Sequence, residues 1–250
     1  MQTTGNTILI TGGGSGIGRG LAEAFHRQGN QVIISGRRAE ALADVTAANP
    51  GMAAFTVDMS DPASIIDLAA QVVAAYPALN AVINNAGIMV DEDILAAPDY
   101  LATAEATIAT NLLGPIRLTA ALLPHLLAQP QASVLTVSSG LAFVTKVSTP
   151  TYSATKAAIH AYSQALRHQL RETSVEVIEI VPPYVQTFLQ GAHQASDPHA
   201  MPLSEYLDET MALLAAVPEH GEVLVERVHV LRYAEQRGQA AQVFGLVNPD

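Results

Sequence analysis

Residues 11–18 read Thr-Gly-Gly-Gly-Ser-Gly-Ile-Gly, directly after the apolar run 7–11 and at the start of a segment, 17–28, whose apolar residues recur every three or four positions. Glycines let a backbone turn sharply and approach a pyrophosphate, and a helix start offers unpaired N–H groups with a partial positive charge. A flexible turn is the alternative interpretation, but the strand before the glycines and the helix after them favour a phosphate-binding loop.

The rest of the chain continues this alternation of short apolar runs and helical patterns. Strands are expected at 7–11, 31–35, 53–57, 81–84, 133–138 and 175–181, with helices near 17–28, 39–48, 62–76, 99–127 and 152–171. Ser60-Asp61-Pro62 supplies a capping side chain and an early proline before the third helix. The pattern predicts an α/β fold of the Rossmann type: a doubly wound parallel sheet in the order 3-2-1-4-5-6, with helices on both faces.

Composition narrows the range of functions. The chain has 250 residues, which we interpret as one domain over 1–250, and 49% of them are hydrophobic. A net charge of −11 would repel a nucleic acid or an anionic membrane, so neither partner is expected. The absence of cysteine excludes disulfides, thiolate nucleophiles and cysteine metal sites. Without a basic leader or about 18 uninterrupted apolar residues, the chain is expected to be cytoplasmic.

The end of the second predicted strand bears on the cofactor. An acid about 20 residues beyond the glycines normally holds the ribose 2′-hydroxyl of NAD. That position is Gly36 here, followed by Arg37 and Arg38. A guanidinium can make two hydrogen bonds to a 2′-phosphate, so NADP(H) is favoured as the cofactor. NAD(H) is the alternative cofactor. The structural alternative is that the two arginines are simply solvated at the start of a helix.

Tyr152 and Lys156 lie four residues apart at the start of a predicted helix, so their side chains share one face. A phenol with a pKa near 10 is a poor base at neutral pH. An ammonium about 4 Å away at an effective dielectric near 20 is worth roughly 4 kcal/mol, which would bring the pKa of the phenol toward about 7. The pair therefore predicts a general acid and base.

Together, the Thr-Gly-x-x-x-Gly-x-Gly spacing of 11–18 and the stretch Tyr152-Ser-Ala-Thr-Lys156 resemble the short-chain dehydrogenase/reductase family, in its branch of about 250 residues. The resemblance runs from 7 to about 187. It implies a catalytic serine thirteen residues before Tyr152, which is Ser139, with Ser138 as the neighbouring alternative. It also implies that Asn111 holds, through its backbone, a water that links Lys156 to solvent. A helix kink or a surface amide is the structural alternative for Asn111.

The same resemblance implies a set of cofactor contacts. Asn84-Asn85-Ala86-Gly87 would brace the sheet and pass the cofactor ribose, Asp58 would accept from the adenine amino group, and a loop after the sixth strand would hold the nicotinamide carboxamide. The implied cofactor-binding residues are Gly12, Ser15, Gly16, Ile17, Gly18, Arg37, Arg38, Asp58, Met59, Asn85, Ala86, Gly87, Tyr152, Lys156, Pro182, Val185 and Thr187.

The chain departs from the family pattern at two places. Pro183 stands where the family has glycine, which removes a donor and fixes φ. The family commonly ends in a seventh strand, whereas 223–237 here has a helical rhythm, so we expect six strands and a helical tail, similar to the DltE-like oxidoreductases. Contacts built on a seventh strand would then be missing, and a homodimer is expected.

These features predict reversible hydride transfer between NADP(H) and a ketone, aldehyde or secondary alcohol. The alternatives are an NAD-linked alcohol dehydrogenase and a cofactor-binding protein without chemistry. A lid is expected over 182–210. Phe143, Tyr184, Phe188, Leu189 and Tyr206 are expected around an apolar substrate pocket. No metal is expected, because His193 and His199 have the spacing of no metal pair and are interpreted as surface histidines.

Overall fold

The computed structural model describes residues 2–216 and 219–249. Its strands form one parallel sheet in the order β3-β2-β1-β4-β5-β6-β7, which confirms the predicted order and adds one strand at the edge. The strands are β1 (Thr7–Thr11), β2 (Gln31–Gly36), β3 (Ala53–Thr56), β4 (Leu79–Asn84), β5 (Ala132–Val137), β6 (Val175–Val181) and β7 (Glu222–Leu224).

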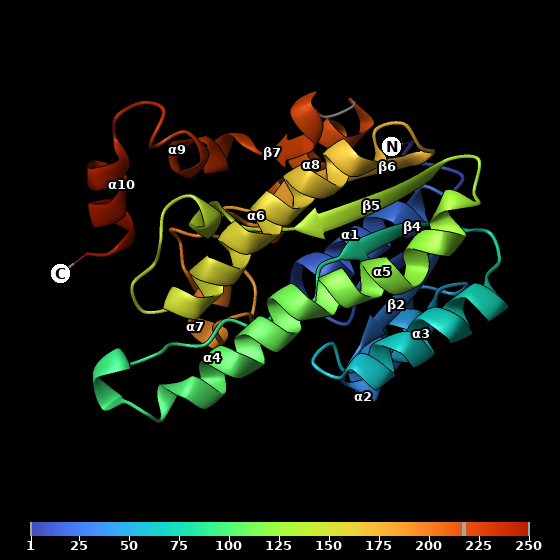
Figure 1. Ribbon diagram of the computed structural model, residues 1–250, viewed down its shortest axis with the longest axis horizontal. Coiled ribbons are helices and arrows are strands. Elements are labelled where there is room, and N and C mark those ends of the chain that lie inside the picture. The colour runs from blue at the N-terminus through green and yellow to red at the C-terminus, as the bar shows by residue number, and fades with distance from the viewer. Residues whose placement is uncertain (1, 217–218, 250) are drawn as a thin grey trace.

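Helices cover both faces of this sheet, as predicted (Figure 1). They are α1 (Gly16–Arg27), α2 (Ala39–Ala48), α3 (Pro62–Ala75), α4 (Tyr100–Ile108), α5 (Gly114–Leu127), α6 (Pro150–Leu170), α7 (Ala192–Ser196), α8 (Leu203–Ala215), α9 (His229–Arg232) and α10 (Ala240–Val247). Successive strand residues point to opposite faces of the sheet and belong to two hydrophobic cores. Ile8 and Ile10 pack with α1, α2 and α8, whereas Leu9 packs with α3, α5 and α6. The central strands β1, β4 and β5 are almost entirely buried because helices cover both of their faces.

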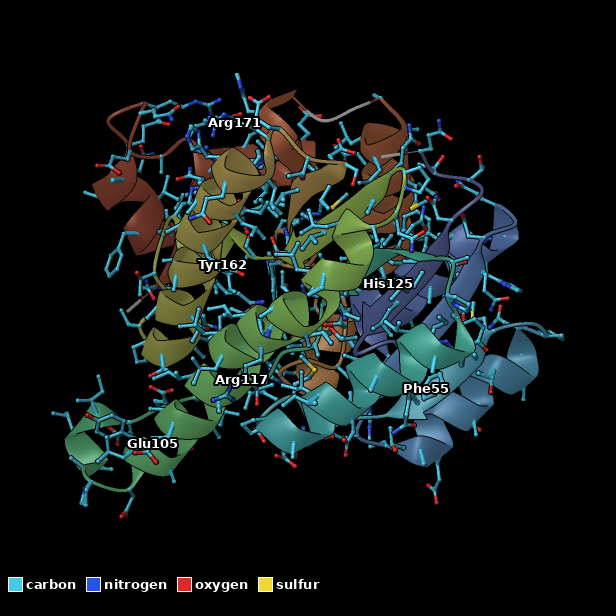
Figure 2. The ribbon with its side chains drawn as sticks, turned by 45° about the vertical axis from the view of Figure 1, so that its right-hand side comes forward. Phe55, Glu105, Arg117, His125, Tyr162 and Arg171 are labelled. Carbon is cyan, nitrogen blue, oxygen red and sulfur yellow. The ribbon has the colours of Figure 1, made fainter. Side chains whose placement is uncertain are left out.

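The expected helix over 99–127 contains one irregular turn. α4 and α5 are joined by a π-helical turn, Ala109–Leu113, which widens the hydrogen-bond ladder at Asn111. Figure 2 marks Glu105, Arg117 and His125 along this helical column and Tyr162 on the neighbouring α6. By length and composition alone, Tyr100–Leu127 is the one helix among the described residues that could cross a membrane, yet it packs against α3 and the sheet.

The third predicted helix begins as its sequence indicates. Asp61 is the N-cap of α3, its side chain accepts from the backbone N–H of Ala63 at 2.9 Å, and Pro62 occupies the first turn. This cap fixes where the chain leaves β3 and turns back along the sheet.

The expectation that the seventh strand is missing was wrong. β7 pairs in parallel with β6, with Val181 opposite Leu224. It has only three residues, too few for an apolar run or an alternation to stand out in the sequence. The helical structure predicted over 223–237 therefore begins later than expected, in the 3₁₀ turn Glu226–Val228 that leads into α9, and the helical tail ends in α10.

Candidate active site

A cavity of about 960 Å³ opens at the carboxyl ends of the central strands, the position where open α/β sheets bind ligands. It collects nearly all of the predicted site residues, although they come from seven separate segments. Those that line it are Gly12, Ser15, Gly16, Ile17, Gly18, Arg37, Arg38, Met59, Asn85, Ala86, Gly87, Ser139, Tyr152, Lys156, Pro182, Val185 and Thr187. Two predicted residues, Asp58 and Asn111, do not line it.

The glycine loop approaches the neighbouring strand very closely. Gly12 has a φ of +71°, which favours glycine, and its N–H donates to the carbonyl of Ser35 at 2.7 Å. A Cβ at Gly18 would lie 2.3 Å from Nδ2 of Asn85 and 2.4 Å from the carbonyl oxygen of Gly12. At the start of α1, the side chain of Ser15 makes no capping bond, so it leaves the first N–H groups of the helix to a ligand. The loop therefore fits a pyrophosphate.

Residues after β4 brace this loop. The Oγ1 of Thr11 accepts from the backbone N–H groups of Asn85 and Ala86, both at 3.0 Å, and the side-chain amide of Asn85 donates to the carbonyl of Thr11 at 2.9 Å. The bracing role that the resemblance implied for 84–87 corresponds to these bonds between the ends of β1 and β4.

Ser139, and not Ser138, faces the phenol of Tyr152. The hydroxyl of Tyr152 is hydrogen-bonded to the side chain of Ser139, which also accepts from the N–H of Leu141 at 3.1 Å. Ser138 also lines the cavity, but its hydroxyl donates to the carbonyl of Ile180 at 3.5 Å. The alternation of side chains at the end of β5 separates these two adjacent serines.

Lys156 lies one helical turn after Tyr152 on α6 and is buried. Its Nζ donates to the carbonyl of Val137 at 2.7 Å and lies 5.5 Å from the centre of the Tyr152 ring. The predicted proximity of the two side chains is therefore present, with the ammonium over the ring.

The expected drop in the pKa of the phenol does not occur. Burial raises the pKa of Tyr152 to about 12, and the hydrogen bond from Ser139 opposes this only in part. Burial also lowers the pKa of Lys156 to about 8, against the nearby charge of Glu179. Removal from water disfavours the charged form of both groups, and this outweighs the attraction that the sequence spacing predicted.

Asn111 lies in the π-helical turn and is buried. Its Oδ1 accepts from the N–H of Ile88 at 2.9 Å, and its Nδ2 donates to the carbonyl of Ile88 at 2.8 Å and to Thr155 Oγ1 at 3.5 Å. The side chain therefore ties the loop after β4 to α6, and it stands behind the cavity wall rather than in it.

The other end of the cavity holds the arginine pair. β2 ends at Gly36, and Arg37 and Arg38 follow on the cavity rim. Asp58 does not line the cavity. Its Oδ1 accepts hydrogen bonds from the side-chain Oγ of Ser60 at 2.7 Å and from the backbone N–H of Ser60 at 2.9 Å. These two bonds lower the pKa of Asp58, and Arg37 contributes to the same shift.

The structure places two of the five predicted pocket residues in the cavity wall and the other three elsewhere. Phe188 and Leu189 line the cavity, whereas Tyr206 is fully buried in the core between α1 and α8. Phe143 packs against His160 and Arg232, and Tyr184 donates to Asp197 at 3.1 Å. Residues 88–90, which line the cavity directly after Gly87, were missed, although their position after a strand end was a signal for them.

The loop after β6 reaches across the glycine loop. Val185 forms a parallel bridge with Met201, and the space beside Gly16 is bounded by Thr187. Pro183 lines the cavity as well. Thr187 Oγ1 accepts from the N–H of Leu189 at 3.3 Å, so this predicted carboxamide partner is held in place by its own loop.

Comparisons with known proteins agree with this arrangement. The family model described as short chain dehydrogenase matches residues 6–197. The uncharacterized oxidoreductase DltE of Bacillus subtilis is 43% identical over 189 residues, 76% of this chain and 75% of that protein. A short chain dehydrogenase from Burkholderia cenocepacia, solved in complex with NADP, has a TM-score of 0.82 at 25% identity and covers 97% of this chain and 98% of its own. A short chain dehydrogenase/reductase from Burkholderia phymatum, solved with NAD, has a TM-score of 0.82 at 19% identity, covering 97% and 96%, and supports the fold alone.

Proposed function

We propose, since the chain belongs to the short-chain dehydrogenase family, that it transfers hydride reversibly between NADP(H) and a ketone, an aldehyde or a secondary alcohol. One observation carries this proposal: the Tyr152 hydroxyl, hydrogen-bonded to Ser139 and next to Lys156, lies in the cavity that the glycine loop also lines. The test is NADPH consumption by the purified protein with a panel of ketones and aldehydes, compared with a Tyr152→Phe variant.

Each side chain has a chemical part in this proposal. NADPH, when bound, supplies the hydride. Tyr152 breaks its O–H bond and gives the proton to the substrate oxygen as that oxygen gains charge, and Ser139 orients the same oxygen. Lys156 stabilises the phenolate that remains and would hold the nicotinamide ribose. Asn111 supports α6 from behind.

The substrate end of the cavity favours an uncharged, apolar molecule. Its walls there are Ile88, Met89, Val90, Phe188 and Leu189, and none of them carries a charge. Apolar walls with a few placed polar groups are typical of sites for small organic ligands. A cytoplasmic location, a single domain over 1–250 and a lid over 182–210 stay predictions. A homodimer also stays a prediction, although β7 removes the reason given for it, which was a missing seventh strand.

The cofactor preference is tested at Arg37. Arg37→Ala should raise the dissociation constant of NADPH about tenfold, because a charge-assisted bond to the 2′-phosphate is lost, and should leave that of NADH unchanged. The two constants are measured by fluorescence titration of the purified proteins. Arg171→Ala, an exposed arginine at the end of α6, is the matched control. If Arg37→Ala raised the dissociation constants of NADPH and NADH by the same factor, a contact between Arg37 and the 2′-phosphate would be refuted.

The pKa values predict different pH profiles for the two directions. Because the pKa of Tyr152 is raised to about 12, the phenol keeps its proton near neutral pH. The rate of reduction should therefore be constant up to the pKa of Lys156, about 8, and should fall at higher pH. Oxidation needs the deprotonated phenol, whose fraction grows about tenfold per pH unit below the pKa of the phenol, so its kcat/KM should climb. Initial rates in both directions check this. A reductive profile that already declines near pH 7 would contradict it, because it would place the phenol's pKa near neutrality.

A further inference from the structure

Four titratable side chains form a cluster beside Lys156, between α6, β6, β7 and α9: His160, Glu179, Glu222 and Arg232. One side-chain nitrogen or oxygen of each of His160, Glu179 and Glu222 lies within 4.8 Å of the other two. Glu179 has no exposed surface. Two carboxylates this close and this buried repel each other and lose hydration, so positive charge must compensate them.

Arg232 compensates Glu222. Its Nε donates to Glu222 Oε2 at 2.8 Å and its Nη2 donates to Oε1 at 3.1 Å, which is a two-pronged pair. The guanidinium also lies 4.7 Å from the centre of the Phe143 ring. Glu179 acts on Arg232 as well, but more weakly than Glu222 does. One charge of the cluster is therefore matched by the adjacent arginine.

His160 orients Glu179. The Nδ1 of His160 lies 2.8 Å from Glu179 Oε2, and its Nε2 lies 3.0 Å from the side-chain nitrogen of Gln164. Both ring nitrogens of His160 are therefore held by polar partners, which fixes the ring against the carboxylate of Glu179. The other oxygen of Glu179 has no hydrogen-bond partner among the described residues.

A further cation near this carboxylate is Lys156. It precedes His160 by one helical turn on α6, and its Nζ donates to Val137, whose neighbour Thr136 is paired with Glu179 across β5 and β6. Within the described ranges, Lys156 makes no ion pair. Burial lowers the pKa of Lys156, and the charge of Glu179 opposes that effect. At the low dielectric of a protein interior such a force acts beyond contact distance.

We propose that Glu179 is a positioning residue: its buried charge, oriented by His160, holds the Lys156 ammonium in its charged form inside the cavity. The ammonium can then stabilise the phenolate of Tyr152 and bind the ribose. The importance of that charge for turnover rests on the proposed function, whereas the electrostatic coupling itself does not.

The chain offers a direct measurement, because it contains only two lysines, Lys146 and Lys156. In protein labelled with ¹³C-lysine, the two Cε signals are followed by NMR as the pH is raised, and Lys146→Arg identifies them. In Glu179→Gln, the midpoint of Lys156 should fall by about one pH unit, the size expected for loss of one interior charge at an effective dielectric near 20. Glu176→Gln, the same change at an exposed position of the same strand, should leave it unchanged.

A Lys156 midpoint that is the same in Glu179→Gln and Glu176→Gln overturns the proposal. If Glu179→Gln does not fold, Glu179→Met is measured instead, because a buried ion replaced by an apolar side chain of similar volume is often well tolerated. The pH above which reduction declines should fall by the same amount as the midpoint. A shifted midpoint in a protein that consumes no NADPH would support the coupling and refute the proposed function, so the two failures are distinguishable.

Discussion

Tyr152→Phe should lower kcat for the reduction of the best ketone or aldehyde substrate by about 10²–10⁴-fold, the contribution typical of a positioned general acid. The variant keeps the ring and loses only the hydroxyl that is bonded to Ser139. The ring also carries the contact with the Lys156 ammonium, 5.5 Å from its centre, so the cavity should keep its shape. The loss should therefore fall on kcat, with the dissociation constant of NADPH changed little. Initial rates of NADPH oxidation measure it.

Tyr162→Phe is the matched control. Tyr162 lies on the same helix, α6 (Figure 2), where it packs partly against the core on the α3 and α5 side and does not line the cavity. The substitution Tyr162→Phe removes a phenol hydroxyl without changing a cavity wall, so kcat should stay within about twofold of the wild-type value. If Tyr152→Phe kept more than about a tenth of the wild-type kcat, the proton would have to come from another group, and the proposed role of the phenol would be wrong.

Gly18→Ala should destabilise the fold and abolish tight NADPH binding. A Cβ at this position meets the side-chain nitrogen of Asn85 at 2.3 Å and the backbone oxygen of Gly12 at 2.4 Å, and the second contact cannot be relieved by a side-chain rotation. Overpacking of this kind costs roughly 1–3 kcal/mol. The bond from Asn85 to Thr11 would be displaced as well, so the loop should leave the position that fits a pyrophosphate. Thermal unfolding and NADPH titration measure the two effects.

Gly14→Ala is the control for this loop. A Cβ at Gly14 would lie 3.4 Å from the Cβ of Ala41, an ordinary contact, and the backbone there is compatible with alanine. Its midpoint of thermal unfolding should stay close to that of the wild type. If Gly18→Ala unfolded at the same temperature as Gly14→Ala and bound NADPH as tightly as the wild type does, the close contact between Gly18 and Asn85 would not be needed for folding or for NADPH binding.

Much of the fold could be predicted because its signals are local. The glycine loop between β1 and α1, the capped start of α3 and the spacing of Tyr152 and Lys156 each occupy a few consecutive residues. Solidly apolar strands between amphipathic helices permit few topologies, because parallel neighbours need crossovers of one hand. The strand order could be predicted from these signals. β7 was not predicted, because a strand of three residues is too short to show a periodic pattern of apolar residues.

By itself, then, the sequence determined the Rossmann-type sheet, the phosphate loop and the four-residue interval of Tyr152 and Lys156. Only the tertiary structure decided that Ser139 and not Ser138 meets the phenol, that Asn111 and Asp58 are bonded outside the cavity, and that Tyr206 belongs to the core. It also decided the direction of the shift in the phenol's pKa and placed Glu179 beside Lys156. The physical reason is that burial and long-range charge depend on elements far apart in the chain, which no local pattern records.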